Sequence, residues 1–258
     1  MRYALLVEYD GTSFHGSQLQ RQERTVQGEL ETGLQKIYGV HARVRLAGRT
    51  DAGVHATGQV AVFDGEDRHS PLTIREALNF HLPDDVAVMG VEPVADQFDP
   101  RRRALRREYV FNLNDGPVRS PLGRWTEVRI KTRLDVAEMQ IAAKCFVGSH
   151  DFASFAGPAT PADATTIRKV DVVDVVRVDG SRIRMKINGN AFLHQQVRRM
   201  AGALVRVGTG KLNKMELAGL VEKPVRGSAG WPLSPEGLCL ARIEYGKDGP
   251  FQAKTEYN

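Results

Sequence analysis

An arginine and an aspartate two residues apart lie between two glycines in the segment LAGRTDAGVHA (46–56). A guanidinium such as that of Arg49 favours the charged form of a nearby carboxyl group such as Asp51. An ionised, oriented carboxylate can act as a nucleophile or a general base. Gly48 and Gly53 allow the backbone to approach a ligand or to take positive φ. Asp51 is therefore a candidate catalytic residue, and the alternative is a hairpin turn with a local salt bridge.

A second polar row occurs in the C-terminal half, where His194, Arg198, Gly202 and Arg206 recur every four residues beside an apolar stripe. Glycine inside a helix costs about 1 kcal/mol relative to alanine, so Gly202 predicts a close approach by another segment. One buried face and one basic face suit a helix that lines a cleft. The alternative is a surface helix with ordinary arginines.

The arginines are also clustered along the chain. Residues 101–107 hold five arginines and no acid, although the net charge of the whole chain is only +5. Planar guanidinium groups pair well with phosphate. A second basic group lies in the C-terminal half: Arg198, Arg199, Arg206, Lys211 and Lys214. Either cluster predicts phosphate contacts, or else a solvated charged face.

Several function classes lack their sequence signatures. The chain contains no GxxxxGK[ST], no GxGxxG after a strand, no HExxH, no CxxC and no GxSxG. Its two cysteines cannot form a four-thiolate zinc site, and the seven histidines have no metal-ligand spacing. The longest run without a charged residue is Ala52 to Phe63, whereas a membrane-spanning helix needs about 20 residues. The apolar N-terminal stretch is too short for a secretory signal. We expect a soluble cytoplasmic protein without a metal.

Hydrophobic periodicity and turn residues predict elements in both halves of the chain. Thr25 and Gly39 have the residue types of a helix N-cap and C-cap. We predict strands over residues 3–9, 42–47, 59–63, 86–91, 108–113, 166–178, 181–188 and 238–245, and helices over 26–37, 73–80, 135–147 and 191–207. Asp179-Gly180 predicts a hairpin turn. Hairpins mixed with a few helices favour an α+β fold with a mainly antiparallel sheet. The two halves are predicted as residues 1–104 and 105–258, joined by the arginine-rich stretch.

Five sequence blocks in order resemble the tRNA pseudouridine synthase A family: YDGT (9–12), FHGSQLQ (14–20), GRTDAGVHA (48–56), GSHDF (148–152) and FLHQQVR (192–198). The resemblance runs nearly from end to end. It implies two similar α/β halves that share an antiparallel sheet, with an active cleft between them. It also implies an isomerase that converts uridine to pseudouridine at tRNA positions 38, 39 and 40, working as a homodimer without metal or cofactor.

The resemblance also assigns roles to residues of this chain. Asp51 matches the catalytic aspartate, Tyr109 the active-site tyrosine, and Arg198 the arginine that pairs with the aspartate. The further residues expected to contact the RNA are Arg49, His55, Arg101, Arg102, Arg103 and Arg106. The chain departs from the family's usual residues at Ser17, Gln195, Gln196, Arg199 and Cys239.

Two other classes of function use some of the same features. A non-catalytic RNA-binding protein would need the basic clusters but not Asp51. A different carboxylate enzyme, such as a nucleosidase, would release free uracil. Neither class explains why the five sequence blocks occur together in this order.

Overall fold

The computed structural model describes residues 1–247 and 249–252, which divide into two compact units. Unit 1 combines Met1–Arg107 with the C-terminal segment from Leu240, and unit 2 is Glu108–Cys239. Most of the last strand belongs to unit 1. The halves over residues 1–104 and 105–258 stay a prediction.

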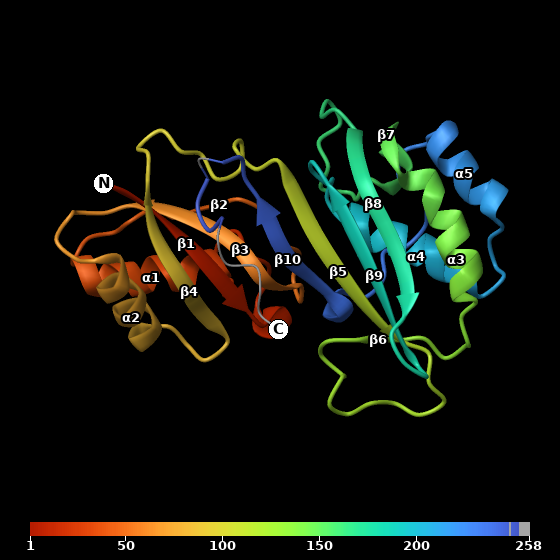
Figure 1. Ribbon diagram of the computed structural model, residues 1–258, viewed down its shortest axis with the longest axis horizontal. Helices are drawn as coiled ribbons and strands as arrows, with labels where there is room; N and C mark the ends of the chain where they lie inside the picture. The colour runs from red at the N-terminus through yellow and green to blue at the C-terminus, as the bar shows by residue number, and fades with distance from the viewer. Residues whose placement is uncertain (248, 253–258) are drawn as a thin grey trace. The chain divides into compact units, whose positions relative to one another are not determined.

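Unit 1 contains a mainly antiparallel sheet with strand order β4-β1-β3-β10, and its helix α2 packs on β4 and on α1 (Figure 1). A short strand, β2, pairs with β3. The elements are β1 (Arg2–Tyr9), η1 (Gly11–Ser13), α1 (Val26–Tyr38), β2 (Arg45–Leu46), β3 (His55–Asp64), α2 (Pro71–His81), β4 (Val86–Val94) and β10 (Leu238–Glu244).

The caps of α1 are as predicted. Thr25 Oγ1 accepts a hydrogen bond from the N–H of Gly28, and Gly39 ends the helix with φ 72°. The predicted strand over 42–47 is reduced to Arg45–Leu46, because most of that segment runs as irregular chain. Strand β3 is longer than predicted, and all of its residues from Gly58 to Phe63 are buried. Both faces of β3 are therefore covered.

The C-terminal strand approaches β3 very closely. A Cβ atom built on Gly58 would lie 2.2 Å from the carbonyl oxygen of Ala241, so only glycine fits there. Farther along, Tyr245 donates a hydrogen bond to the carbonyl of Pro100, and its ring packs against Phe98. These contacts fasten β10 and Tyr245 to the rest of unit 1.

Unit 2 repeats the plan with strand order β5-β9-β8-β7, and α3 packs against β8, α4 and α5. In Figure 1, α4 crosses behind β8 and β9. The elements are β5 (Arg106–Asn114), β6 (Val128–Arg129), α3 (Val136–Ala143), η2 (Lys144–Phe146), β7 (Gly148–Asp151), η3 (Ala153–Phe155), β8 (Ile167–Arg177), β9 (Arg182–Gly189), α4 (Gln196–Gly208), α5 (Lys214–Glu222) and η4 (Pro235–Gly237). The predicted hairpin β8–β9 and the α+β class with a mainly antiparallel sheet are confirmed.

The predicted start of the helix at residue 191 is wrong. Helix α4 begins at Gln196, because Gln195 has φ 58°, which interrupts a right-handed helix. His194 therefore lies before the helix, and only Arg198, Gly202 and Arg206 of the predicted polar row belong to it. None of the helices in the described ranges is long and apolar enough to cross a membrane.

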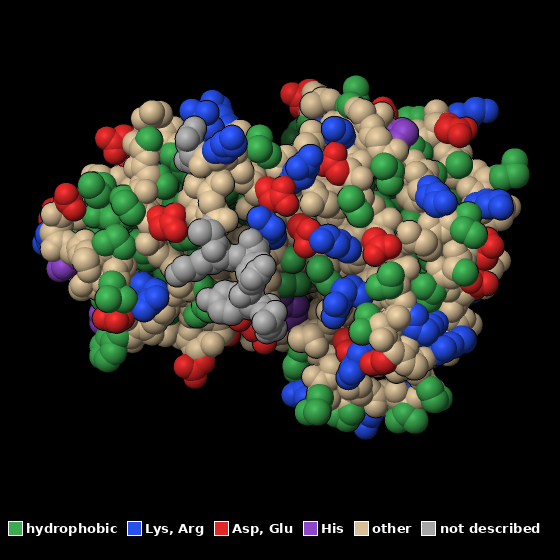
Figure 2. Space-filling model, viewed as in Figure 1, with side chains coloured by type: hydrophobic (Ala, Val, Ile, Leu, Met, Phe, Trp, Pro, Cys, Tyr) green, Lys and Arg blue, Asp and Glu red, His purple; other side chains and the backbone are tan. Residues whose placement is uncertain are grey.

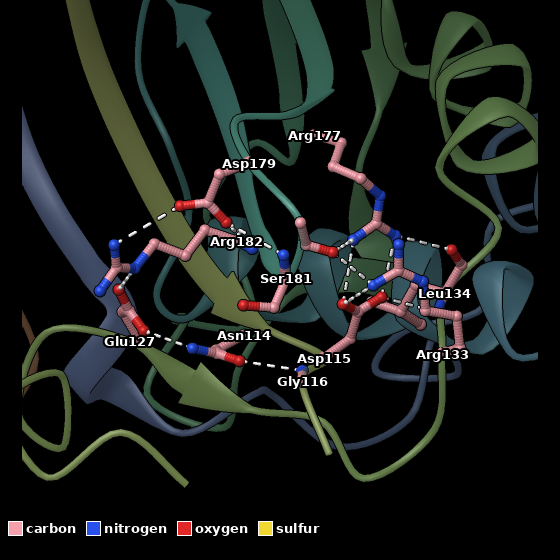
Figure 3. A network of polar contacts seen from close by, with 11 residues as sticks. Asn114, Asp115, Gly116, Glu127, Arg133, Leu134, Arg177, Asp179, Ser181 and Arg182 are labelled. Carbon is pink, nitrogen blue, oxygen red and sulfur yellow. Dashed lines mark hydrogen bonds and ion pairs between the residues drawn. The ribbon is translucent and has the colours of Figure 1, made fainter. Parts of the chain in front are cut away.

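A long connection, residues 116–134, links β5 to α3 and contains the short strand β6. Most of it forms the loop drawn below the β6 label in Figure 1. Its exposed residues include Val118 and Leu122, and Figure 2 shows hydrophobic and basic side chains together in this part of the molecule. The Asp115 carboxylate fastens both ends of the connection (Figure 3). It accepts hydrogen bonds from Arg133 (2.9 Å), from Arg177 (2.9 and 3.0 Å) and from the N–H of Leu134 (2.9 Å).

Asp115 is a buried carboxylate that depends on its partners for stability. Its side chain is 0% exposed in both ion pairs. Burial by itself would raise the pKa of Asp115, but the hydrogen bonds from Arg177 and Leu134 together with the charges of Arg177 and Arg133 lower it below its ordinary value. The structure thus needs this carboxylate ionised.

Replacing Asp115 with Asn removes the charge that two arginines surround. We expect the free energy of unfolding at pH 7 to fall by about 3 kcal/mol, because a broken buried ion pair leaves charges uncompensated. The folded-state pKa lies below the unfolded value of about 3.9, so the carboxylate stabilises above that value and the effect fades as pH falls through the folded-state pKa. Urea denaturation at neutral and acidic pH measures both effects. The exposed Asp84, replaced by Asn, is the control, and equal losses in the two variants would contradict the assignment.

Candidate active site

Asp51 lies half-buried in the connection between β2 and β3, residues 47–54, here called the Asp51 loop. The residue before it is fixed by Ser17. The N–H of Thr50 donates to Ser17 Oγ (2.9 Å), and the N–H of Ser17 donates back to the carbonyl of Thr50 (3.1 Å). Ser17 is fully buried, and its own carbonyl accepts a hydrogen bond from Gln27 N–H in α1. The Asp51 backbone is therefore held by contacts from residues far away in the sequence.

Side chains of β1 and β3 hold the rest of this connection. The Tyr9 hydroxyl and Thr50 Oγ1 lie 2.8 Å apart in a buried hydrogen bond. Gln59 pairs with both backbone groups of Gly48: its Nε2 donates to the carbonyl (2.8 Å), and its Oε1 accepts from the N–H (3.2 Å). Buried polar groups that are satisfied in this way rigidify a segment.

His55 supports the turn from within. It is buried, and its Nδ1 lies 3.1 Å from the N–H of Gly11 and 3.1 Å from Asp10 Oδ1. Gly53 has φ 77°, the conformation that favours glycine, as the sequence suggested. Its N–H donates to the carbonyl of Phe14 (3.3 Å). His55 thus fixes the loop, and its expected contact with RNA stays a prediction.

The arginine-rich stretch separates into a buried and an exposed part. Arg107 is buried and donates to the carbonyl of Ala47 (3.3 Å), at the start of the Asp51 loop, and to that of Arg101 (2.8 Å). Arg106 forms an ion pair with Glu244 (3.5 Å). The side chains of Arg49, Arg101, Arg102 and Arg103 are exposed.

Unit 2 carries the other two residues that the sequence predicts as catalytic. Tyr109 is a buried residue of β5, and its ring meets that of Phe192 edge to face, with 5.4 Å between the ring centroids. Such an edge-to-face contact fixes the orientation of the tyrosine ring.

Arg198 lies in the first turns of α4, where a later segment of the chain docks. Its Nε donates to the carbonyl of Leu233 (2.7 Å), and its own carbonyl accepts from Leu233 N–H (3.1 Å). A Cβ atom on Gly202 would lie 2.9 Å from the carbonyl oxygen of Trp231. The close approach predicted at Gly202 is therefore confirmed, and the approaching segment is residues 229–233.

Three of the residues that depart from the family pattern are buried and have structural contacts. Ser17 holds Thr50, as described above. Gln196, the first residue of α4, accepts the N–H of Leu193 at its Oε1 (2.8 Å). Arg199 donates to the carbonyl of Gly230 (2.5 Å). Sequence reasoning identified these positions as unusual but not the local contacts that they make.

Metal binding has no evident place in the described part of the chain. Residues 1–247 and 249–252 contain no group of three or more His, Cys, Asp or Glu side chains arranged to hold a metal ion. The candidate catalytic residues carry a carboxylate (Asp51), a phenol (Tyr109) and a guanidinium group (Arg198).

Comparison with known proteins places these features in a family. The family model described as tRNA pseudouridine synthase matches residues 5–101 and 142–246. The chain belongs to the tRNA pseudouridine synthase family. It is 40% identical to a tRNA pseudouridine synthase A of Afipia carboxidovorans over 95% of this chain and 99% of that protein. It is 41% identical to a tRNA pseudouridine synthase A of Bradyrhizobium sp. over 95% of this chain and 99% of that protein. It is 40% identical to that of Geobacter sulfurreducens over 93% of this chain and 98% of that protein.

Family membership makes the chain an isomerase of the pseudouridine synthase class. The matched segments include Asp51 and Arg198, whereas Tyr109 lies between them. Among solved structures, an archaeal box H/ACA sRNP Nop10–Cbf5 complex is similar over 92% of this chain and 58% of that chain. That likeness, with TM-score 0.39 and 9% identity, is too low to support an argument.

Replacing Ser17 with Ala tests the support of the Asp51 loop. We expect the free energy of unfolding to fall by about 1–2 kcal/mol, because the buried Thr50 N–H loses its acceptor. Exchange of the Thr50 amide hydrogen should become faster. Ser13→Ala, at an exposed position of η1, is the matched control, and unchanged exchange at Thr50 in Ser17→Ala would refute the support.

Proposed function

We propose that this chain converts uridine to pseudouridine in tRNA, at positions 38, 39 and 40 of the anticodon stem-loop, with Asp51 as the nucleophile. The observation that carries the proposal is the rigid placement of Asp51, in a chain that matches tRNA pseudouridine synthases over 95% of its length. The resemblance also leads us to expect a homodimer that acts in the cytoplasm.

The reaction requires a bound base that leaves the ribose and returns. The bond from uracil N1 to the ribose C1′ breaks, and a bond from C5 to C1′ forms. The proton on C5 is lost, and N1 gains a proton, so the mass of the RNA is unchanged. The uridine must be taken out of the base stack to reach the protein groups.

Each predicted residue has a chemical task in this scheme. As nucleophile, Asp51 can add to the uracil ring or to the sugar carbon. As a base, it can instead help to remove the C2′ proton of the sugar. The fixed Thr50 backbone supports this role, because it limits the positions that the carboxylate can take. The family resemblance assigns Arg198 as the arginine that pairs with this aspartate.

Tyr109 offers two groups to the base. Its ring can stack on uracil, and its hydroxyl can assist loss of the C5 proton. The edge-to-face contact with Phe192 supports both tasks, because it fixes the tyrosine ring.

The phosphate contacts are expected at the exposed arginines. Arg101, Arg102 and Arg103 have their side chains in solvent, while Asp99 binds the backbone N–H groups of Arg101 and Arg102 (both 2.9 Å). The backbone is thereby ordered while the guanidinium groups stay exposed. Arg106 contributes less, because Glu244 already compensates its charge.

The catalytic role of Asp51 is tested by tritium release from tRNA labelled at uracil C5. Asp51→Asn should reduce the release by more than about 1,000-fold, because the amide is not a nucleophile. Binding of tRNA should change by less than about threefold, which controls for folding. Unchanged release would contradict the role of Asp51. Free uracil in the products would show a nucleosidase instead of an isomerase.

The phosphate contacts are tested by the salt dependence of tRNA binding. Replacing Arg101, Arg102 and Arg103 together with Ala should reduce the slope of log K against log salt by about 2, since each phosphate contact releases counterions. Lys36→Ala, an exposed cation of α1, should leave the slope unchanged. Equal slopes in wild type and the triple variant would exclude these arginines.

A further inference from the structure

A tryptophan side chain stands almost entirely in solvent on a fixed loop of unit 2. Trp231 is 92% exposed, in the segment of residues 229–233, here called the Trp231 loop. Tryptophan is the largest apolar side chain. Because Trp231 is exposed, its ring contributes almost no favourable free energy of apolar burial to folding. The position therefore calls for an explanation outside the packing of the chain itself.

The backbone of the Trp231 loop is held to α4 at several points. Leu233 exchanges two hydrogen bonds with Arg198, and Arg199 donates to the carbonyl of Gly230. The carbonyl of Trp231 lies against Gly202, where no larger residue fits. The indole ring is thus presented by rigid backbone two residues from Leu233, the hydrogen-bond partner of Arg198.

Three arginines of α4 donate hydrogen bonds to carbonyl groups of the loop. Arg198 donates to Leu233, Arg199 to Gly230 and Arg206 to Ala229. Arg199 is 9% exposed, and its Nε has no hydrogen-bond partner within the described residues. Burial and the charge of Arg198 lower the pKa of Arg199. A polyanion at this place would interact favourably with the positive charges of these arginines.

We propose that Trp231 is a stacking platform for an unpaired nucleobase of the RNA substrate. The proposal rests on the function proposed above, and it adds a binding residue outside the reacting groups. A uridine drawn out of its stack leaves its neighbouring bases without a stacking partner. An indole face can take that place, since bases stack on aromatic side chains regardless of sequence. A ring on rigid backbone loses little freedom when it binds.

The other exposed aromatic residues provide contrasts. Phe80 is 84% exposed, but it lies in α2 of unit 1. Trp125, the other tryptophan of the chain, is 48% exposed in the connection 116–134, and the guanidinium of Arg124 lies 5.3 Å from its ring centroid. Trp231 is distinguished from both by its loop, which is bonded to Arg198.

Intrinsic fluorescence tests the proposal directly. In the variant Trp125→Phe, Trp231 is the sole tryptophan. Addition of an anticodon stem-loop RNA should quench its emission, because a stacked base quenches indole. The quenching should saturate at the same Kd that fluorescence anisotropy of labelled RNA reports. Tight RNA binding without quenching would overturn the stacking role.

Affinity provides a second readout. Trp231→Ala should raise the Kd for the RNA about tenfold, Trp231→Phe should recover most of the loss, and Phe80→Ala should match wild type. If Trp231→Ala binds the RNA with the wild-type Kd and the enzyme isomerises uridine, the stacking role of Trp231 is wrong and the proposed function is retained. If wild type binds no RNA, the proposed function fails as well. Blue-shifted emission that depends on protein concentration without RNA would show a second copy on Trp231 and overturn the proposal.

Discussion

The pair of hydrogen bonds between Ser17 and Thr50 is the constraint on which the Asp51 loop depends. It closes a ring between two segments that are distant in sequence, and Tyr9, Gln59 and Arg107 attach the same loop to its surroundings. All of these contacts belong to unit 1, so its own core determines where the Asp51 backbone lies. A carboxylate that must meet one atom of a substrate benefits from backbone that is ordered beforehand.

Helix α4 plays the corresponding part in unit 2. Its first turns carry Arg198, whose carbonyl and guanidinium both bind Leu233, while Arg199 holds Gly230. The helix is thus both a core element and the support for a later loop. Each unit therefore has its own rigid support: residues of β1 and β3 in the first, and α4 in the second.

Much of this architecture follows from local sequence signals. Thr25 and Gly39 mark the ends of α1, Asp179-Gly180 marks the β8–β9 turn, and Gly202 indicates a close approach that the structure contains. The five blocks that identify the family also located the Asp51 loop. These signals depend on neighbours in sequence or on one residue type.

Other features depend on distant contacts and could not be predicted. Apolar spacing predicts a start of α4 that is too early, because the spacing continues through Gln195, where the backbone takes φ 58°. Arg107 has the same residue type as the exposed Arg101 to Arg103, yet it is buried beneath the Asp51 loop. The role of Ser17 also depends on its distant partner, Thr50. Residue type alone cannot distinguish such partners.

The chain order of unit 1 affects how the protein is made. The N-terminal part of this unit leaves the ribosome first, but β10, which pairs with β3, is synthesised only after all of unit 2. Domains fold as units during synthesis, and unit 2 is a continuous segment. Unit 2 can therefore fold on the nascent chain. Until β10 is synthesised, the backbone N–H and C=O groups of β3 that will pair with it have no strand partner. Such an edge can pair with other chains, so completion of the last strand ends a period of exposure to misassembly.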